Sequence, residues 1–161
     1  MHDTSALVTA LSAALRQRGW LMTTAESCTG GLIAGACTDL AGSSDWFERG
    51  FVSYSNQAKT DMLGVDAALI ATHGAVSEAV ALAMAVGAVA HSRAQCSLSV
   101  TGVAGPGGGS PTKPVGTVWF GWNVSGQADA ECLQLPGDRA AVRQATLQHA
   151  LAGLLQRLQG I

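Results

Sequence analysis

The chain has 161 residues, of which 48% are hydrophobic and 12% are charged, and its formal net charge is −2. This length is typical of one domain with a single core, and the lack of a basic cluster excludes a broad nucleic-acid-binding surface. The four cysteines form no Cys-x-x-Cys pair, and Gly, Ser, His or charged residues interrupt every long apolar segment. We therefore expect no metal site, no membrane span, no secretory signal and a cytoplasmic location.

Strand and helix patterns alternate along the chain. The first helix has Ser5 as a candidate cap and Gly19 as a stop. After it, short apolar or alternating runs indicate strands, and longer periodic runs indicate helices. We predict strands at 20–22, 50–54, 96–101, 117–124 and 130–135, and further helices at 32–40, 57–63, 66–73, 77–90 and 138–158.

This order of elements predicts an α/β fold in one domain spanning residues 1–161. The last two strands are separated by Ser125-Gly126 and are typical of a β-hairpin. The sheet should therefore be mixed rather than all parallel, with about five strands and helices on both faces. The low charged fraction also favours a homodimer or larger homo-oligomer.

A small, hydroxyl-rich and glycine-rich loop over residues 23–31 follows the first predicted strand and precedes a helix. Open α/β sheets bind ligands at the carboxyl ends of their strands, and amides at a helix N-terminus attract negative charge. Ser27 is placed to attack an electrophile there, with the amides of Cys28 to Gly30 holding the oxyanion. The alternative is that Ser27 or Thr29 only caps the helix.

Lys59 and Tyr54 lie five residues apart, where a strand ends and a helix begins. The helix dipole and burial would both lower the pKa of the lysine, which suits a general base. A Ser nucleophile, a Lys base and a Tyr hydroxyl that orients the proton could together hydrolyse an amide. The alternative is an exposed Lys59 and a Tyr54 packed in the core.

The segment 102–114 contains five glycines and three prolines and matches neither a phosphate-binding P-loop nor a dinucleotide fingerprint. Its glycines could let backbone amides approach a phosphate or a ribose, or it could be a plain connection. Arg139 and Arg143 lie one turn apart at the start of the last helix. They could clamp a phosphate or form a solvated helix face.

Two further side chains of the first loop leave alternatives open. Cys28 could be the nucleophile in place of Ser27, with His73 or His91 as base, or it could be a small buried hydrophobe. Glu26 could orient Lys59 or could satisfy polar groups of the loop.

Several of these motifs, in the same order and over nearly the whole chain, resemble the CinA C-terminal domain family. The matching stretches are Ala25-Glu26-Ser27-Cys28-Thr29-Gly30-Gly31, Gly50-Phe51-Val52-Ser53-Tyr54-Ser55-Asn56 with Lys59, Leu63-Gly64-Val65, His73-Gly74-Ala75-Val76-Ser77-Glu78, Thr101-Gly102-Val103-Ala104-Gly105-Pro106-Gly107-Gly108-Gly109 and Lys113-Pro114-Val115-Gly116-Thr117-Val118.

The resemblance implies a three-layer α/β/α sandwich and an amidase that converts nicotinamide mononucleotide to nicotinate mononucleotide and ammonia. It implies no metal and no cofactor for this step. The nucleophile would be Ser27, assisted by Lys59 and Tyr54. We predict that the substrate is bound by residues of the two loops, the strand ends and the last helix. These residues are Cys28, Thr29, Gly30, Gly31, Asn56, Thr101, Gly102, Val103, Ala104, Gly105, Arg139 and Arg143.

The resemblance also leaves a second class of function open. Proteins of this family carry names linked to competence and DNA damage, so the chain could be a non-catalytic nucleotide-binding or regulatory protein. Such a protein would keep the glycine-rich loop and the pocket, and Lys59→Ala would alter nothing but its affinity for the nucleotide.

Overall fold

The computed structural model describes residues 3–161, which form a five-stranded mixed sheet between two layers of helices. The strand order is β2-β1-β3-β4-β5, in which β1 runs parallel to β2 and β3, while β4 is antiparallel to β3 and β5. In chain order the elements are α1 (Thr4–Arg18), β1 (Met22–Glu26), α2 (Leu32–Thr38), the 3-10 helix η1 (Ser43–Asp45), β2 (Phe47–Val52), α3 (Asn56–Leu63), α4 (Ala67–His73), α5 (Glu78–Ala90), β3 (Cys96–Gly102), β4 (Thr117–Val124), β5 (Gln127–Gln134) and α6 (Arg139–Gln159).

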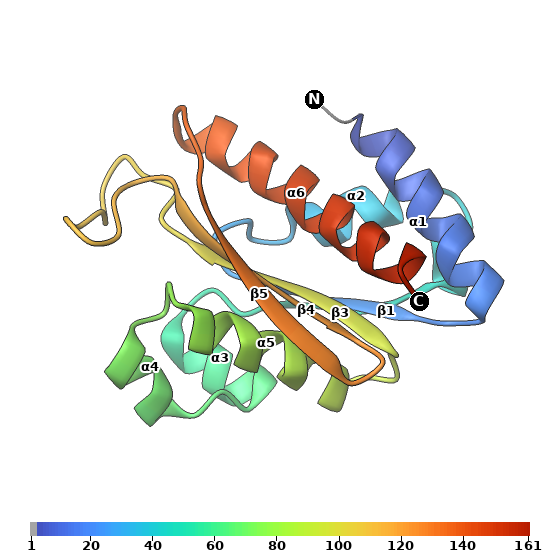
Figure 1. The fold of residues 1–161 in the computed structure, drawn as a ribbon, viewed down its shortest axis with the longest axis horizontal. Coiled ribbons are helices and arrows are strands. Elements are labelled where there is room, and N and C mark those ends of the chain that lie inside the picture. Colours follow the sequence, from blue (N-terminus) through green and yellow to red (C-terminus); the bar gives the residue numbers. More distant parts are fainter. Residues whose placement is uncertain (1–2) are drawn as a thin grey trace.

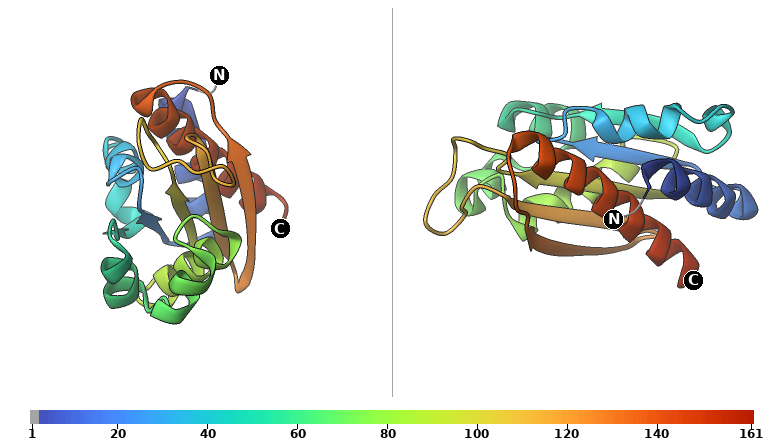
Figure 2. Two further views of the ribbon diagram at one scale, coloured as in Figure 1. Left: turned by 90° about the vertical axis from the view of Figure 1, so that its left-hand side faces the viewer. Right: turned by 90° about the horizontal axis from the view of Figure 1, so that it is seen from above.

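The helices divide between the two faces of the sheet. Helices α1, α2 and α6 cover one face, and α3, α4 and α5 cover the other (Figure 1), as the turned views also show (Figure 2). Each layer has its own apolar cluster: Leu11, Trp122 and Leu151 belong to the first, and Phe51 and Met84 to the second. The predicted three-layer α/β/α sandwich is therefore confirmed.

Helix α5 lies close against the sheet because small residues and hydroxyl groups meet at the contact. Ser97 and Ser99 of β3 donate their hydroxyls to the carbonyls of Ala85 and Ala81, at 2.6 and 2.7 Å. A Cβ on Gly121 of β4 would stand only 2.5 Å from the Ala81 carbonyl oxygen. This close packing fixes α5 against the sheet, with the start of the helix near the carboxyl end of β3.

The predicted first strand was misplaced. Residues 20–22 were expected in the strand and 23–26 in the following loop, whereas β1 spans Met22–Glu26. The hydroxyl-bearing residues of this segment belong to a central strand that pairs on both edges, and Thr23 also donates to the Arg49 carbonyl at 2.7 Å. Pairing on both edges satisfies the backbone and overrides the loop-like composition.

Smaller boundaries differ as well. β2 and β5 each begin three residues before the predicted start, at Phe47 and Gln127. Asp3, not Ser5, caps α1, because its carboxylate accepts the Ser5 amide at 3.0 Å. Within residues 3–161, no helix combines the length and the apolar character needed to cross a membrane.

Candidate active site

One buried carboxylate at the end of β1, that of Glu26, holds the turn that follows this strand. Glu26 is 1% exposed, and its Oε1 accepts hydrogen bonds from the Thr29 hydroxyl at 2.6 Å and the Ile33 amide at 2.9 Å. Gly31 and Ala34 donate their amides to the same carboxylate, at 3.2 and 2.9 Å. Glu26 thus satisfies the first amides of α2, and of the two roles left open for it the structure supports the one in the loop.

Because Glu26 takes this role, the side chain of Ser27 is free for another. The residue at the N-cap of α2 is Gly31, which makes no side-chain capping bond. The alternative that Ser27 or Thr29 is a simple cap is therefore wrong. Instead, Ser27 Oγ lies 3.0 Å from Lys59 Nζ and 3.2 Å from the Tyr54 carbonyl oxygen.

Lys59 reaches this serine from the first turns of α3, which Ser55 caps by accepting the Ala58 amide at 3.0 Å. The residue is 1% exposed, and within residues 3–161 its amine forms no ion pair. Nζ donates to Ser27 Oγ and to the Tyr54 carbonyl, each at 3.0 Å. Burial lowers the pKa of the Lys59 amine from its ordinary value. The alternative of an exposed Lys59 is wrong.

Tyr54 contributes to this cluster through its main chain. Its carbonyl oxygen accepts from both Lys59 and Ser27. Its side chain is not in the core, since the residue is 59% exposed. In the part of the chain that the structure describes, its hydroxyl forms no hydrogen bond. The orienting role that the sequence assigned to the phenol is therefore one that the carbonyl can perform.

The thiol next to Ser27 is poorly suited to be the nucleophile. Cys28 is 6% exposed, and burial raises its pKa to about 11, so the thiolate is scarce at neutral pH. One of the two histidines considered as its base, His91, has Nδ1 2.8 Å from the Gly87 carbonyl at the end of α5. These observations count against a cysteine mechanism.

A cavity of about 220 Å³ opens over Ser27 and Lys59. It gathers nine of the residues that the sequence singled out, from four separate segments. Ala75 and Val76 complete it; they stand in one of the quoted motifs, but the sequence assigned them no role. Its lining consists of Ser27, Cys28, Tyr54, Asn56, Lys59, Ala75, Val76, Thr101, Gly102, Ala104 and Arg139.

Thr101 joins the two sides of this cavity. It is 1% exposed, and its hydroxyl donates to the Ala75 carbonyl at 2.9 Å. The bond holds the segment before α5 against the end of β3. Thr101 therefore shapes the wall, while its hydroxyl proton is already engaged.

A second cavity of about 670 Å³ adjoins the first, and the two share Ala104 and Arg139. It is lined by the glycine-rich segment and the start of α6, including Arg143. Arg139 donates from Nη1 to the Gly105 carbonyl at 2.8 Å. Val103 is paired with the neighbouring strand end, since its amide donates to the Thr117 carbonyl at 2.9 Å.

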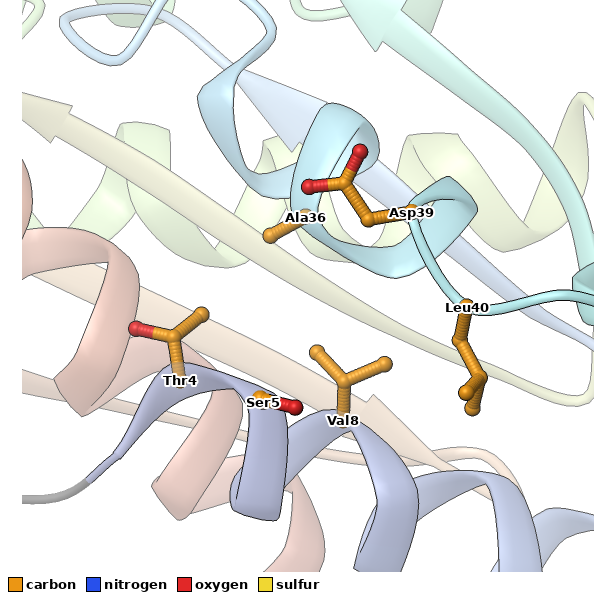
Figure 3. Close-up of a pocket in the computed structure, with 6 residues that line it drawn as sticks. All are labelled: Thr4, Ser5, Val8, Ala36, Asp39 and Leu40. Atoms are coloured by element: carbon orange, nitrogen blue, oxygen red, sulfur yellow. The ribbon is translucent and has the colours of Figure 1, made fainter.

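Three predicted binding residues lie on the other side of the turn. Thr29, Gly30 and Gly31 line a hollow of about 510 Å³ between α2 and α6, not the cavity over Ser27. That hollow shares Thr4, Ala36 and Asp39 with a smaller pocket of about 310 Å³ between α1 and α2 (Figure 3). The chain turns sharply after Cys28, so Cys28 lines the cavity over Ser27 while Thr29 lines the hollow between α2 and α6.

Arg143 crosses from α6 to the turn that carries Ser27. It donates from Nε to the Cys28 carbonyl and from Nη2 to the Thr29 carbonyl, each at 3.1 Å. The sequence predicted a phosphate ligand at this position and did not predict contacts with the loop backbone. Among residues 3–161, no three His, Cys, Asp or Glu side chains converge as a metal site would require.

Comparison with known families identifies one match over nearly the whole chain. The model of the CinA C-terminal domain matches residues 4–158. "Nicotinamide-nucleotide amidohydrolase PncC" of Escherichia coli strain K12 is 53% identical over 147 residues, which are 89% of this chain and 88% of that protein. The protein of the same name from Pseudomonas putida is 52% identical over 156 residues, covering 97% of this chain and 98% of that protein.

Solved structures agree with this match. A CinA superfamily protein from Klebsiella pneumoniae 700603 superposes with a TM-score of 0.95 at 39% identity, covering 99% of this chain and 100% of that one. A competence/damage-inducible protein from Agrobacterium tumefaciens has a TM-score of 0.94 at 45% identity, with 99% and 97% coverage.

Proposed function

The chain belongs to the CinA C-terminal domain family, and we propose that it is a nicotinamide-nucleotide amidohydrolase, acting on a carboxamide C–N bond. Its reaction would convert nicotinamide mononucleotide and water to nicotinate mononucleotide and ammonia, as a step in the recycling of pyridine nucleotides. Two relatives that are 53% and 52% identical over most of the chain carry this enzyme name. The observation that carries the proposal is the 3.0 Å contact between Ser27 Oγ and Lys59 Nζ in a cavity.

In the first half of the reaction, Ser27 Oγ attacks the carboxamide carbon and its proton passes to the neutral amine of Lys59. The distance between the two atoms suits direct proton transfer. A buried amine with a lowered pKa is neutral in a larger fraction of molecules. The Tyr54 carbonyl accepts from both groups and keeps them together.

The tetrahedral intermediate then collapses with loss of its C–N bond. Lys59 returns the proton to the leaving nitrogen, ammonia departs, and an ester to Ser27 remains. Water attacks this ester, gives a proton to Lys59, and the proton finally returns to Ser27 Oγ as nicotinate mononucleotide leaves. Each step uses the same amine alternately as base and acid.

The amides of the turn offer a place for the developing oxyanion. Ser27 and Gly30 donate theirs to the carbonyls of Val100 and Ser27, both at 3.1 Å, and Gly31 donates to Glu26. In the described chain, the amides of Cys28 and Thr29 have no acceptor. Of these two residues only Cys28 lines the cavity over Ser27, whereas Thr29 is 0% exposed. The amide of Cys28, and not that of Gly30, is therefore our candidate for binding the oxyanion.

The ribose and phosphate would extend from the Ser27 cavity into the adjoining one. Ala104 and Arg139 line both cavities, so the passage between them carries a cation. A guanidinium is well suited to a phosphate. We propose that Arg139 selects the nucleotide, with backbone groups of Gly102 to Gly105 beside the ribose.

The test is ammonia release from nicotinamide mononucleotide by the purified protein, compared with Ser27→Ala and Tyr54→Phe. We expect Ser27→Ala to lower kcat by at least about 10⁴-fold. Tyr54→Phe keeps the carbonyl and should change kcat by less than about fivefold, equivalent to about 1 kcal/mol. A folded wild-type protein without turnover would favour the non-catalytic regulatory function instead.

Two further expectations belong to this proposal. The enzyme would work in the cytoplasm, where its nucleotide substrate is found. The low charged fraction of 12% supports a homodimer or larger homo-oligomer. Light scattering on the purified protein measures the mass, and a monomer at micromolar concentration would exclude the oligomer.

A further inference from the structure

Arg143 lies on α6, in the helix layer opposite the one that supplies Lys59 (Figure 1). The two side chains therefore approach the turn after β1 from different faces of the sheet. Arg143 donates two hydrogen bonds to consecutive carbonyls of this turn, those of Cys28 and Thr29. Those bonds join residues 115 and 114 positions apart in the chain.

The bond to the Cys28 carbonyl has a direct consequence for Cys28 itself. Cys28 lines the cavity over Ser27, into which Lys59 also reaches, whereas Thr29 lines the hollow between α2 and α6. A peptide group is planar and trans, so a held carbonyl fixes the whole peptide plane that follows Cys28. The two bonds from Arg143 therefore restrict the conformation of Cys28, and with it the position of the Cys28 amide beside Ser27.

The Cys28 amide also needs an explanation of its own. Cys28 is only 6% exposed, yet within the described residues its amide donates to no acceptor. Buried amides without a partner are rare in folded proteins and costly. The cost is understandable if the amide is held ready for an oxygen that is present only during the reaction.

We propose that Arg143 is a positioning residue, which holds the carbonyls of Cys28 and Thr29 and thereby keeps the Cys28 N–H in place for the oxyanion that forms when Ser27 attacks the carboxamide. This inference rests on the proposed amidohydrolase function. It assigns Arg143 to the chemical step, whereas a phosphate ligand would act in substrate binding. Arg139, one turn earlier on α6, holds a single carbonyl of the glycine-rich segment and remains the candidate for the phosphate.

The experiment compares Arg143→Ala and Arg143→Lys with Arg139→Ala and, as a matched surface control on the same helix, Gln144→Ala. Steady-state kinetics with nicotinamide mononucleotide separate kcat from KM. Loss of correct positioning should lower kcat of Arg143→Ala by about 10²-fold with little change in KM. Arg143→Lys can hold one carbonyl but not both, so it should recover part of kcat.

Two more readouts distinguish positioning from a general loss of structure. Added guanidinium ion at millimolar concentration should restore part of the kcat of Arg143→Ala and leave the kcat of Arg139→Ala unchanged. Hydrogen exchange, which needs no turnover, should become faster at amides 28–34 in Arg143→Ala and stay unchanged in Gln144→Ala. Arg139→Ala should raise KM instead.

The outcomes separate this inference from the proposed function. A raised KM with unchanged kcat in Arg143→Ala would make Arg143 a substrate ligand and overturn the inference while leaving the amidohydrolase intact. Unchanged exchange at amides 28–34 would overturn it as well. If the wild-type protein had no turnover, the proposed function would fail, and the exchange experiment alone would decide whether Arg143 holds the turn.

Discussion

Two glycine-rich connections leave the same end of the sheet, and they are built in opposite ways. The turn after β1 is held by Glu26 from one side and by Arg143 from the other, and Ser27 to Thr29 are all buried. The segment between β3 and β4 projects beyond the sheet (Figure 1), and residues 106–112 are exposed. Both resemble flexible loops in composition, yet only the second has few partners.

The difference suggests a division of labour between the two connections. Chemistry requires a nucleophile, a base and amides held in nearly fixed positions, and the first connection meets this requirement through charged side chains from other elements. Few contacts hold the second: Lys113 donates from Nζ to the His73 carbonyl at 2.8 Å, Arg139 donates to the Gly105 carbonyl at 2.8 Å, and Ser110 donates its amide to the Lys113 carbonyl at 2.9 Å. Such a segment can adapt around a bound nucleotide.

The largest expected effect comes from removing the proposed base, Lys59, beside the turn that follows β1. Lys59→Met keeps the length of the side chain but removes the amine, so kcat for ammonia release should fall by about 10³-fold. The fold should persist, because the buried amine has no ion pair to lose. Circular dichroism and the ammonia assay measure the two quantities, and near-native turnover in Lys59→Met would remove the lysine from the mechanism.

The next effect concerns the carboxylate that organises the turn. In Glu26→Gln one acceptor oxygen becomes an NH₂ group, which must then face a buried amide such as that of Ala34. We expect the free energy of unfolding to fall by about 3 kcal/mol. Urea unfolding measures this, and Glu78→Gln at the exposed start of α5 is the control, with a change below about 0.5 kcal/mol. Equal changes in both variants would show that Glu26 does not organise the turn.

The pH dependence tests the lowered pKa of Lys59. In the proposed mechanism the reactive form is the neutral amine, so kcat/KM should rise with pH, about tenfold per unit at most, and level off at a pKa below the ordinary value of 10.5. The unfolded chain binds the extra proton between these two pKa values, so folding stability should also rise with pH in this window. Lys59→Met should lose the stability trend, and a kcat/KM profile that levels off only at an ordinary lysine pKa would contradict the assignment.

The smallest effect is expected in the exposed connection. Lys113→Ala removes the bond to the His73 carbonyl at the end of α4, but the groups it leaves are near solvent. The free energy of unfolding should change by less than about 1 kcal/mol, and kcat should stay within about fivefold of wild type. Urea unfolding and the ammonia assay check this, and a loss as large as that of Glu26→Gln would erase the contrast between the two connections.

The local features of this protein were determined by its sequence. Helix caps and stops act within one turn of their own helix, so the sequence alone indicates them. Examples are the caps at Ser55, Asp66 and Ser77 and the stop at Gly64. The same is true of a hydroxyl-bearing loop between a strand and a helix, and of a lysine in the first turns of α3. Together with the family resemblance, these features predicted the three-layer sandwich and most of the residues that line the Ser27 cavity.

Only the tertiary structure decided how groups distant in the chain are paired. Whether residues 23–26 form a loop or a central strand depends on neighbours that lie far away in the sequence. The same is true of the hydrogen bonds from Ser27 and Lys59 to the Tyr54 carbonyl, and of the contact of Arg143 with a turn 114 residues before it. These outcomes depend on which donor and acceptor are buried together, because a buried polar group must find its partner wherever the fold brings one.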